Sequence, residues 1–223
     1  SSKISISNKI MAVGASGANK ILIYEDSNAD SIFSGEVEHS FTSTEGIYAG
    51  LFDSSLAVSD TILVIGDTDS DAKPLGETSS YQNSGSITVY ADGNDADLLF
   101  SNESAQVLKA SDAKKLGYFG RSVAIYDNII AVGASKADGL QVDSGAVYIF
   151  IDKNRDGFFD ELPIKIQASD GKTNDGFGSN VLLQSNRLIV AASKGFGATG
   201  SVYVFQDESG NNDFLDLSEQ QLV

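Results

Sequence analysis

The sequence has no cysteine and no tryptophan, and among its 223 residues there are only two prolines, one methionine and one histidine. Without cysteine the chain cannot form a disulfide, a thiolate zinc site or a cysteine nucleophile. The single histidine, His39, lies in an alternating segment at 37–41. A lone strand histidine is more often structural than catalytic, and there is no second imidazole to share a metal site.

Positive charge and long apolar runs are also scarce. Fifteen basic residues against 31 acidic ones give a net charge of −16, which disfavours nucleic acid and anionic membranes as partners. No apolar run approaches the ~18 residues that a membrane-spanning helix needs, so we expect no membrane insertion. The chain begins Ser1-Ser2 with neither a methionine nor a signal-like segment, which suggests a processed chain or an excised part of a longer one.

What the sequence does contain indicates an all-β protein. No window sustains apolar residues at helical spacing, whereas short runs rich in Val, Ile, Tyr and Phe recur between Gly, Asp, Asn and Ser. The apolar fraction of 41% is enough for a packed core, and 22 glycines indicate many turns. We expect one domain over residues 1–223.

One pattern occurs four times along the chain. The run IIAVGAS at 129–135 has counterparts at 10–16, 62–67 and 188–193. Each is preceded by an apolar strand and a tight polar turn and followed by two further strands. We call the four expected strands A, B, C and D. The repeats cover approximately 1–52, 53–119, 120–177 and 178–223.

Four antiparallel strands repeated at this period are typical of the blades of a β-propeller. A two-sheet sandwich with accidental similarity is the alternative, but the repeat extends through turns as well as strands. Strand B is almost continuously apolar, which predicts cover on both faces, whereas strand C alternates, which predicts one face near solvent. Expected D strands are 37–41, 106–109, 164–167 and 220–223.

The third repeat carries a family resemblance. FGRSVAIYDNIIAVGAS and DSGAVYIF within Phe119–Phe150, followed by KIQASDG and DGFG, resemble bacterial FG-GAP repeats. These are β-propeller repeats related to those of the integrin α-subunit head. The resemblance weakens toward the first repeat, and the usual Gly-Ala-Pro is replaced by Gly-Ala-Ser, Gly-Asp-Thr or Ala-Ala-Ser. It implies a propeller, and the Phe-Gly pairs are expected to pack between blades.

Propellers of this family usually close with seven blades. Four repeats therefore predict either a four-bladed ring or part of a larger propeller, completed by other chain material or by a second copy. Uncovered terminal blades would otherwise expose a sheet face.

The turn between strands C and D of the third repeat has the spacing of a calcium loop. Its candidate ligands are Asp152, Asn154, Asp156, the Phe158 carbonyl and Asp160. Oxygen ligands at alternate positions with a glycine at the bend resemble the first nine positions of an EF-hand loop, and they favour Ca²⁺ over zinc or copper. Integrin-type propellers have a similar loop in the A–B turn, which lies on the same side of a blade as the C–D turn.

The other C–D turns are weaker versions of this loop. Their candidate ligands are Asp26, Asn28 and Asp30 in the first repeat, Asp92 and Asn94 in the second, and Asp207, Ser209 and Asn211 in the fourth. The alternative is that Asp, Asn and Gly simply make good hairpin turns. If Ca²⁺ binds, we expect it to stabilise the scaffold by joining strand C to strand D.

The opposite side of a propeller carries the B–C and D–A loops. The longest of these, Asp67–Ser84, is either a tolerated insertion or a ligand-binding loop. Tyr48, Tyr81 and Tyr118 lie in or near such loops, where each could stack on a sugar or peptide or pack between blades.

No nucleophile–base pair, phosphate loop or metal-hydrolase motif is present, so we do not expect an enzyme. The sequence favours a secreted or surface-bound binding or adhesion module for glycan or protein ligands. The alternatives are a catalytic or non-catalytic module of a polysaccharide-degrading enzyme, and a structural subunit of a surface assembly.

Overall fold

The computed structural model describes residues 3–15, 20–26, 28, 33, 37, 39–42, 55–71, 81–92, 100, 105–194 and 199–222. Over this part of the chain the protein consists of β-strands, turns and loops, as the sequence predicts. No helix found there has the length and apolar character to cross a membrane.

The strands form four antiparallel sheets, each made of four consecutive strands. Blade 1 comprises β1 (Lys3–Ile6), β2 (Ile10–Ala15), β3 (Lys20–Glu25) and β4 (His39–Thr42); blade 2 comprises β5 (Ser55–Val58), β6 (Ile62–Asp67), β7 (Ser86–Ala91) and β8 (Gln106–Leu108). Blade 3 comprises β9 (Phe119–Tyr126), β10 (Ile129–Ala134), β11 (Ala146–Ile151) and β12 (Ile164–Ile166); blade 4 comprises β13 (Phe177–Gln184), β14 (Arg187–Ala192), β15 (Ser201–Asp207) and β16 (Leu217–Leu222). The predicted four-stranded units are therefore confirmed.

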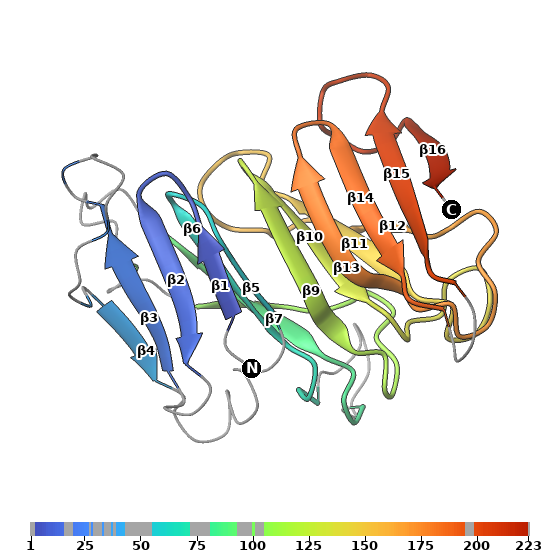
Figure 1. The fold of residues 1–223 in the computed structure, drawn as a ribbon, viewed down its shortest axis with the longest axis horizontal. Helices are drawn as coiled ribbons and strands as arrows, with labels where there is room; N and C mark the ends of the chain where they lie inside the picture. Colours follow the sequence, from blue (N-terminus) through green and yellow to red (C-terminus); the bar gives the residue numbers. More distant parts are fainter. Residues whose placement is uncertain are drawn as a thin grey trace.

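The four blades stand face to face in sequence order, with β1, β5, β9 and β13 next to one another along the row (Figure 1). Blades 1 and 4 lie at opposite ends of the row. The described residues thus form an open array of propeller blades, and they do not close a four-bladed ring.

Burial differs between the inner and the end blades. Strands β6 and β10 are buried along their whole length, as predicted for strand B. The prediction that strand C keeps one face near solvent is wrong for β7 and β11, which are buried except at their last residue. In the end blades, β3 and β15 do alternate. A blade between two others has both faces covered, so position in the row decides this burial more than local pattern does.

Several strand boundaries differ from prediction. Strands β9 and β13 begin at Phe119 and Phe177, four residues before Val123 and Val181, where the apolar runs predict their starts, because the Phe-Gly pair continues each strand across a bulge. Strand β16 begins at Leu217, whereas the expected start is Gln220. The D strands β8 and β12 end one residue earlier than predicted, and β4 spans His39–Thr42 where the sequence predicts 37–41.

The Phe-Gly pairs form the joints between blades, as predicted. Phe119 and Phe177 are each 1% exposed and belong to the apolar clusters between blades 2 and 3 and between blades 3 and 4. The Phe119 ring contacts Tyr148 at 5.4 Å edge to face, and Phe177 contacts Tyr203 at 5.3 Å in the same way.

The glycine of each pair has a backbone conformation that other residues rarely adopt, with φ +88° at Gly120 and +85° at Gly178. This places the Gly120 and Gly178 carbonyls against the preceding blade. A Cβ at Gly66 would lie 2.3 Å from the Gly120 oxygen, and one at Gly133 would lie 2.0 Å from the Gly178 oxygen. Gly66 and Gly133 therefore leave room for the Phe-Gly pair of the next blade.

Candidate functional site

The C–D turns of all four blades are joined to the A–B turns beside them. The first aspartate of each C–D turn donates its backbone N–H to an A–B turn carbonyl: Asp26 to Lys9, Asp92 to Thr61, Asp152 to Asn128 and Asp207 to Asn186, at 2.8 to 3.0 Å. The Asn128 amide also donates to the Asp152 carbonyl at 2.6 Å. The two sets of turns lie on one edge of the array, as predicted, and we call it the acidic edge.

The turn of blade 3 is closed by its own hydrogen bonds. Asp152, which is 3% exposed, accepts the Arg155 N–H on Oδ1 at 2.7 Å and the Gly157 N–H on Oδ2 at 2.8 Å. Asp156 accepts the Phe158 N–H and the Asn154 amide. These bonds are those of a good Asx-type turn, and each carboxylate oxygen retains a further lone pair.

The turn of blade 4 is closed less completely. Asp207 is fully buried; its Oδ1 accepts the Ser209 hydroxyl at 2.7 Å, while its Oδ2 has no hydrogen-bond partner of normal geometry. Burial works to raise the pKa of Asp207, but the Ser209 hydroxyl and the backbone N–H groups of Asn212 and Phe214 lower it overall. A buried, ionised carboxylate with an unpaired oxygen is the environment in which a cation stabilises a turn.

The fit of these turns to Ca²⁺ is therefore partial. Within the described ranges, no three His, Cys, Asp or Glu side chains converge as a metal site. Asp160 is exposed at the end of its turn, and the Phe158 side chain is 51% exposed. In blade 1 Asp26 is buried and Asn28 is exposed. Asp30 and Asn94 lie outside the described residues. The sequence ranks the blade 3 turn first, whereas the unpaired oxygen lies in blade 4.

A phenylalanine anchors each of three acidic turns, and the sequence reasoning missed it. Phe100, Phe159 and Phe214 are 1%, 2% and 1% exposed and belong to the three interblade clusters. Phe159 also exchanges two hydrogen bonds with the Gln106 side chain of blade 2, at 2.9 and 3.1 Å. The sequence does contain a signal for these anchors, because a Phe follows the first aspartate of every C–D turn by seven or eight residues.

A hollow of about 510 Å³ lies between the acidic turns of blades 2 and 3. Asp92, Asp127, Asp152 and Asp156 line it together with Arg155. Arg155 forms a two-pronged ion pair with Asp127, and this pair lowers the pKa of Asp127. The arginine offsets part of the negative charge that the turns concentrate here.

The opposite edge, which we call the loop edge, carries the long B–C loop of blade 2. Its described ends are held together, since Asn83 donates its side-chain amide to Asp69 and its backbone N–H to Asp71, both at 2.9 Å. Burial raises the pKa of Asp67 at the start of this loop, and the nearby Asp69 charge adds to the effect. Tyr81 is half-buried at the other end. Tyr48 and residues 72–80 lie outside the described residues.

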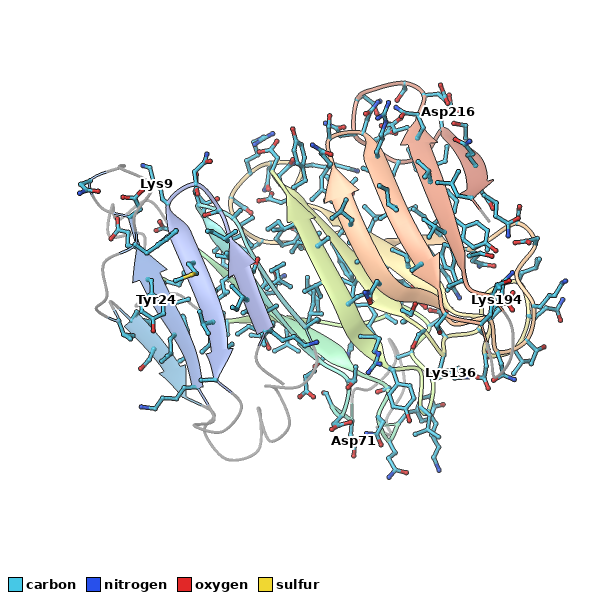
Figure 2. All side chains as sticks on the ribbon, viewed as in Figure 1. Lys9, Tyr24, Asp71, Lys136, Lys194 and Asp216 are labelled. Carbon is cyan, nitrogen blue, oxygen red and sulfur yellow. The ribbon has the colours of Figure 1, made fainter. Side chains whose placement is uncertain are left out.

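Tyr118 and residues of three blades line a second, larger hollow of about 610 Å³ on the loop edge. The lining is made of Thr68, Asp69, Tyr118, Arg121, Ser135, Lys136, Ser179, Asn180 and Ser193. In Figure 2, Lys136, Lys194 and Asp71 lie along this edge, and Lys9 and Asp216 lie along the acidic edge.

Two tyrosines tie neighbouring blades together near the loop edge, and the sequence reasoning missed both ties. The buried Tyr148 hydroxyl donates to Asp112 at 2.6 Å, and the buried Tyr203 hydroxyl donates to Asp170 at 2.7 Å. Each aspartate belongs to an Ala-Ser-Asp segment after strand D, and each tyrosine lies on strand C of the next blade. Burial raises the pKa of both tyrosines, and the hydrogen bonds that their hydroxyls donate to the aspartates raise it further.

A comparison with protein-family models finds the FG-GAP repeat twice, at residues 103–150 and 163–205. Each matched range begins around strand D of one blade and ends with strand C of the next, so the sequence repeat is offset from the sheets by one strand. The Phe-Gly joint lies inside each repeat for this reason. No curated protein matches the chain.

Proposed function

We propose, on the premise that this chain belongs to the FG-GAP repeat family, that it is an extracellular, calcium-stabilised binding or adhesion module. Its ligand is a glycan or a protein, bound at the loop edge without catalysis. The observation that carries the proposal is the chemical difference between the two edges: four aspartates line the hollow at the acidic edge, whereas hydroxyl, amide and basic side chains line most of the hollow of about 610 Å³ at the loop edge. That volume is in the range of ordinary ligand sites.

Calcium is the cation that the acidic edge suits best. FG-GAP repeats often bind Ca²⁺. The residues that would hold it are Asp152, Asn154, Asp156, the Phe158 carbonyl and Asp160 in blade 3, and Asp207, Ser209 and Asn211 in blade 4. The weaker turns would contribute Asp26, Asn28 and Asp30, and Asp92 and Asn94. The unpaired Asp207 oxygen supports this assignment. Modest-affinity sites of this kind fill outside the cell, which supports a secreted or cell-surface location.

The proposal also concerns what covers the outer faces of blades 1 and 4. The inner blades show that this fold buries such faces against another blade. We therefore place a second copy of the chain against them in the assembled protein.

The test measures binding and turnover in one experiment. The whole chain, with Ca²⁺ present, is applied to immobilised polysaccharides and extracellular matrix proteins, and the solution is assayed for released sugar ends and peptides. Saturable binding without product supports the module. Product release would show an enzyme, and absence of binding to every surface would overturn the proposal.

A separate experiment tests the calcium assignment. Addition of EDTA is expected to lower the melting temperature of the protein. An unchanged melting temperature, with no calcium found by elemental analysis, would remove the calcium assignment.

A further inference from the structure

The hollow on the loop edge has a repeated hydroxyl lining. Thr68, Ser135 and Ser193 all line it, and each directly follows the last residue of strand B in its blade. They occupy the third position of the Gly-Ala-type motif, where the sequence departs from Gly-Ala-Pro. A hydroxyl both donates and accepts hydrogen bonds, whereas proline at this position would offer neither a side-chain nor a backbone N–H donor. Three blades thus present matching hydrogen-bonding groups to one space.

The charge of this hollow is opposite to that of the whole protein. Arg121 and Lys136 line it, against the single carboxylate of Asp69, although the chain carries a net charge of −16. Within the described ranges neither basic side chain forms an ion pair. The Lys136 ammonium donates to the neutral Asn174 amide at 2.7 Å, and the exposed Arg121 faces solvent. Two basic side chains in one polar hollow favour an anionic ligand.

Tyr118 is held in this lining against its backbone preference. Its φ is +53°, a conformation that is uncommon for a bulky residue. At the equivalent place before the next Phe-Gly pair, blade 4 has Gly176 with φ +69°. The fold therefore accepts glycine here, and the tyrosine costs about 1 kcal/mol or more of strain. The buried anchors Phe100 and Phe214 also have positive φ, so the strain alone assigns no role. Tyr118 differs from them because it lines an open polar hollow, which fits a role in ligand contact.

We propose that this hollow binds an acidic saccharide, that is, a sugar chain whose units carry carboxylate or sulfate groups. The guanidinium of Arg121 and the ammonium of Lys136 pair with the anionic groups. The hydroxyls of Thr68, Ser135 and Ser193 hydrogen-bond to the sugar hydroxyls, and the Tyr118 ring stacks on the sugar ring. This inference rests on the proposed binding function and names its ligand class.

The test uses the whole chain with calcium and measures affinity by calorimetry for three oligosaccharides of equal length: an oligogalacturonate, a sulfated oligosaccharide and a neutral cello-oligosaccharide. The acidic ligands are expected to bind at least tenfold more tightly than the neutral one and to weaken as salt is raised. The two acidic arms distinguish carboxylate from sulfate. Equal affinity for the neutral ligand, or equal competition by a polyglutamate peptide, would overturn the proposal.

Three variants assign the binding to this hollow. Arg121→Gln is expected to lose tenfold or more in affinity for the acidic ligand. The matched control Arg187→Gln changes an exposed arginine at the start of β14, next to the acidic edge, and keeps wild-type affinity. Tyr118→Gly is expected to lose affinity yet retain or raise the melting temperature, because glycine relieves the backbone strain. Wild-type affinity in Arg121→Gln contradicts the site. If other glycans or proteins bind but no acidic saccharide does, this inference fails and the proposed function stands; if nothing binds, both fail.

Discussion

Gly133 shows how one residue controls the distance between two blades. An alanine there would place its Cβ 2.0 Å from the Gly178 carbonyl oxygen and 2.4 Å from the Ser122 hydroxyl. Backbone cannot move aside as a flexible side chain can, so blades 3 and 4 would have to separate. We expect Gly133→Ala to lower the free energy of unfolding by about 3 kcal/mol, measured by urea denaturation.

Blade 4 supplies the matched control for this substitution. Ala191 occupies the equivalent position on β14, and the described structure has no further blade against it. Ala191→Gly should cost no more than about 1 kcal/mol, the ordinary penalty of glycine in a strand. A Gly133→Ala protein as stable as the wild type would mean that the joint is looser than its geometry indicates.

Asp112 provides a pH-dependent contact at the joint between blades 2 and 3. Burial works to raise its pKa, but the Lys165 ammonium at 2.5 Å and the Tyr148 hydroxyl lower the pKa overall, below the ordinary value of an aspartate. A carboxylate with a lowered pKa stabilises the folded state above its unfolded pKa, and this contribution disappears as the pH falls through the folded value.

We therefore expect Asp112→Asn to be less stable than the wild type at pH 7, by up to about 1 kcal/mol because the pair is half exposed, and the difference to shrink below about pH 4. Chemical denaturation at a series of pH values measures it. Lys165→Gln is the partner control and should reduce the same pH dependence. A gap between Asp112→Asn and wild type that stays constant with pH would assign the effect to packing.

At the scale of the element, the acidic turns depend on their phenylalanine anchors. Phe159 is 2% exposed between blades 2 and 3, whereas its neighbour Phe158 is 51% exposed. Removing a buried Phe costs about 3–5 kcal/mol, so Phe159→Ala should lower the melting temperature strongly. Phe158→Ala, which keeps the backbone carbonyl offered to calcium, should change stability by no more than about 0.5 kcal/mol. Equal effects of the two substitutions would contradict the anchor.

The sequence predicts the positions of the strands better than it predicts their burial and their contacts with other blades. Apolar runs and polar turns identify all sixteen strands of the described residues and their order, because strand formation and hairpin pairing are local. Burial of β7 and β11 was missed because it depends on neighbouring blades, which a strand's own pattern does not record. The candidate calcium ligands follow from spacing, but the closure of the Asp152 turn by its own N–H groups and the hollow around Arg121 arise from three-dimensional contacts.

At the scale of the whole molecule, the open array leaves an apolar face at each end. On blade 1 the strand register aligns Ile4 with Val13 and Val13 with Leu22, and Ile4 is 67% exposed. On blade 4 it aligns Leu182 with Ile189, and Leu182 is 54% exposed. In the inner blades the equivalent residues of strand B are buried, and the equivalents of Ile4, which are Leu56 and Val123, are half-buried. Repeat arrays require cover over such ends.

The two end faces are opposite faces of the blade. The inner blades stack face to face in sequence order (Figure 1), so the same stacking would bring blade 1 of one copy onto blade 4 of another. Such a contact joins two different surfaces and is therefore head-to-tail.

We accordingly expect the chain to self-associate, with a mass in sedimentation equilibrium that rises above 23.5 kDa as concentration increases. Ile4→Lys should shift the protein toward monomer without unfolding it, because the side chain is exposed within one copy and a buried lysine would oppose the contact between two. Leu162→Lys is the matched control: Leu162 is 70% exposed but lies in the C–D turn of blade 3, away from both end faces, and its substitution should leave association unchanged. A monomer at every concentration, or equal loss of association in both variants, would rule out the end-to-end contact.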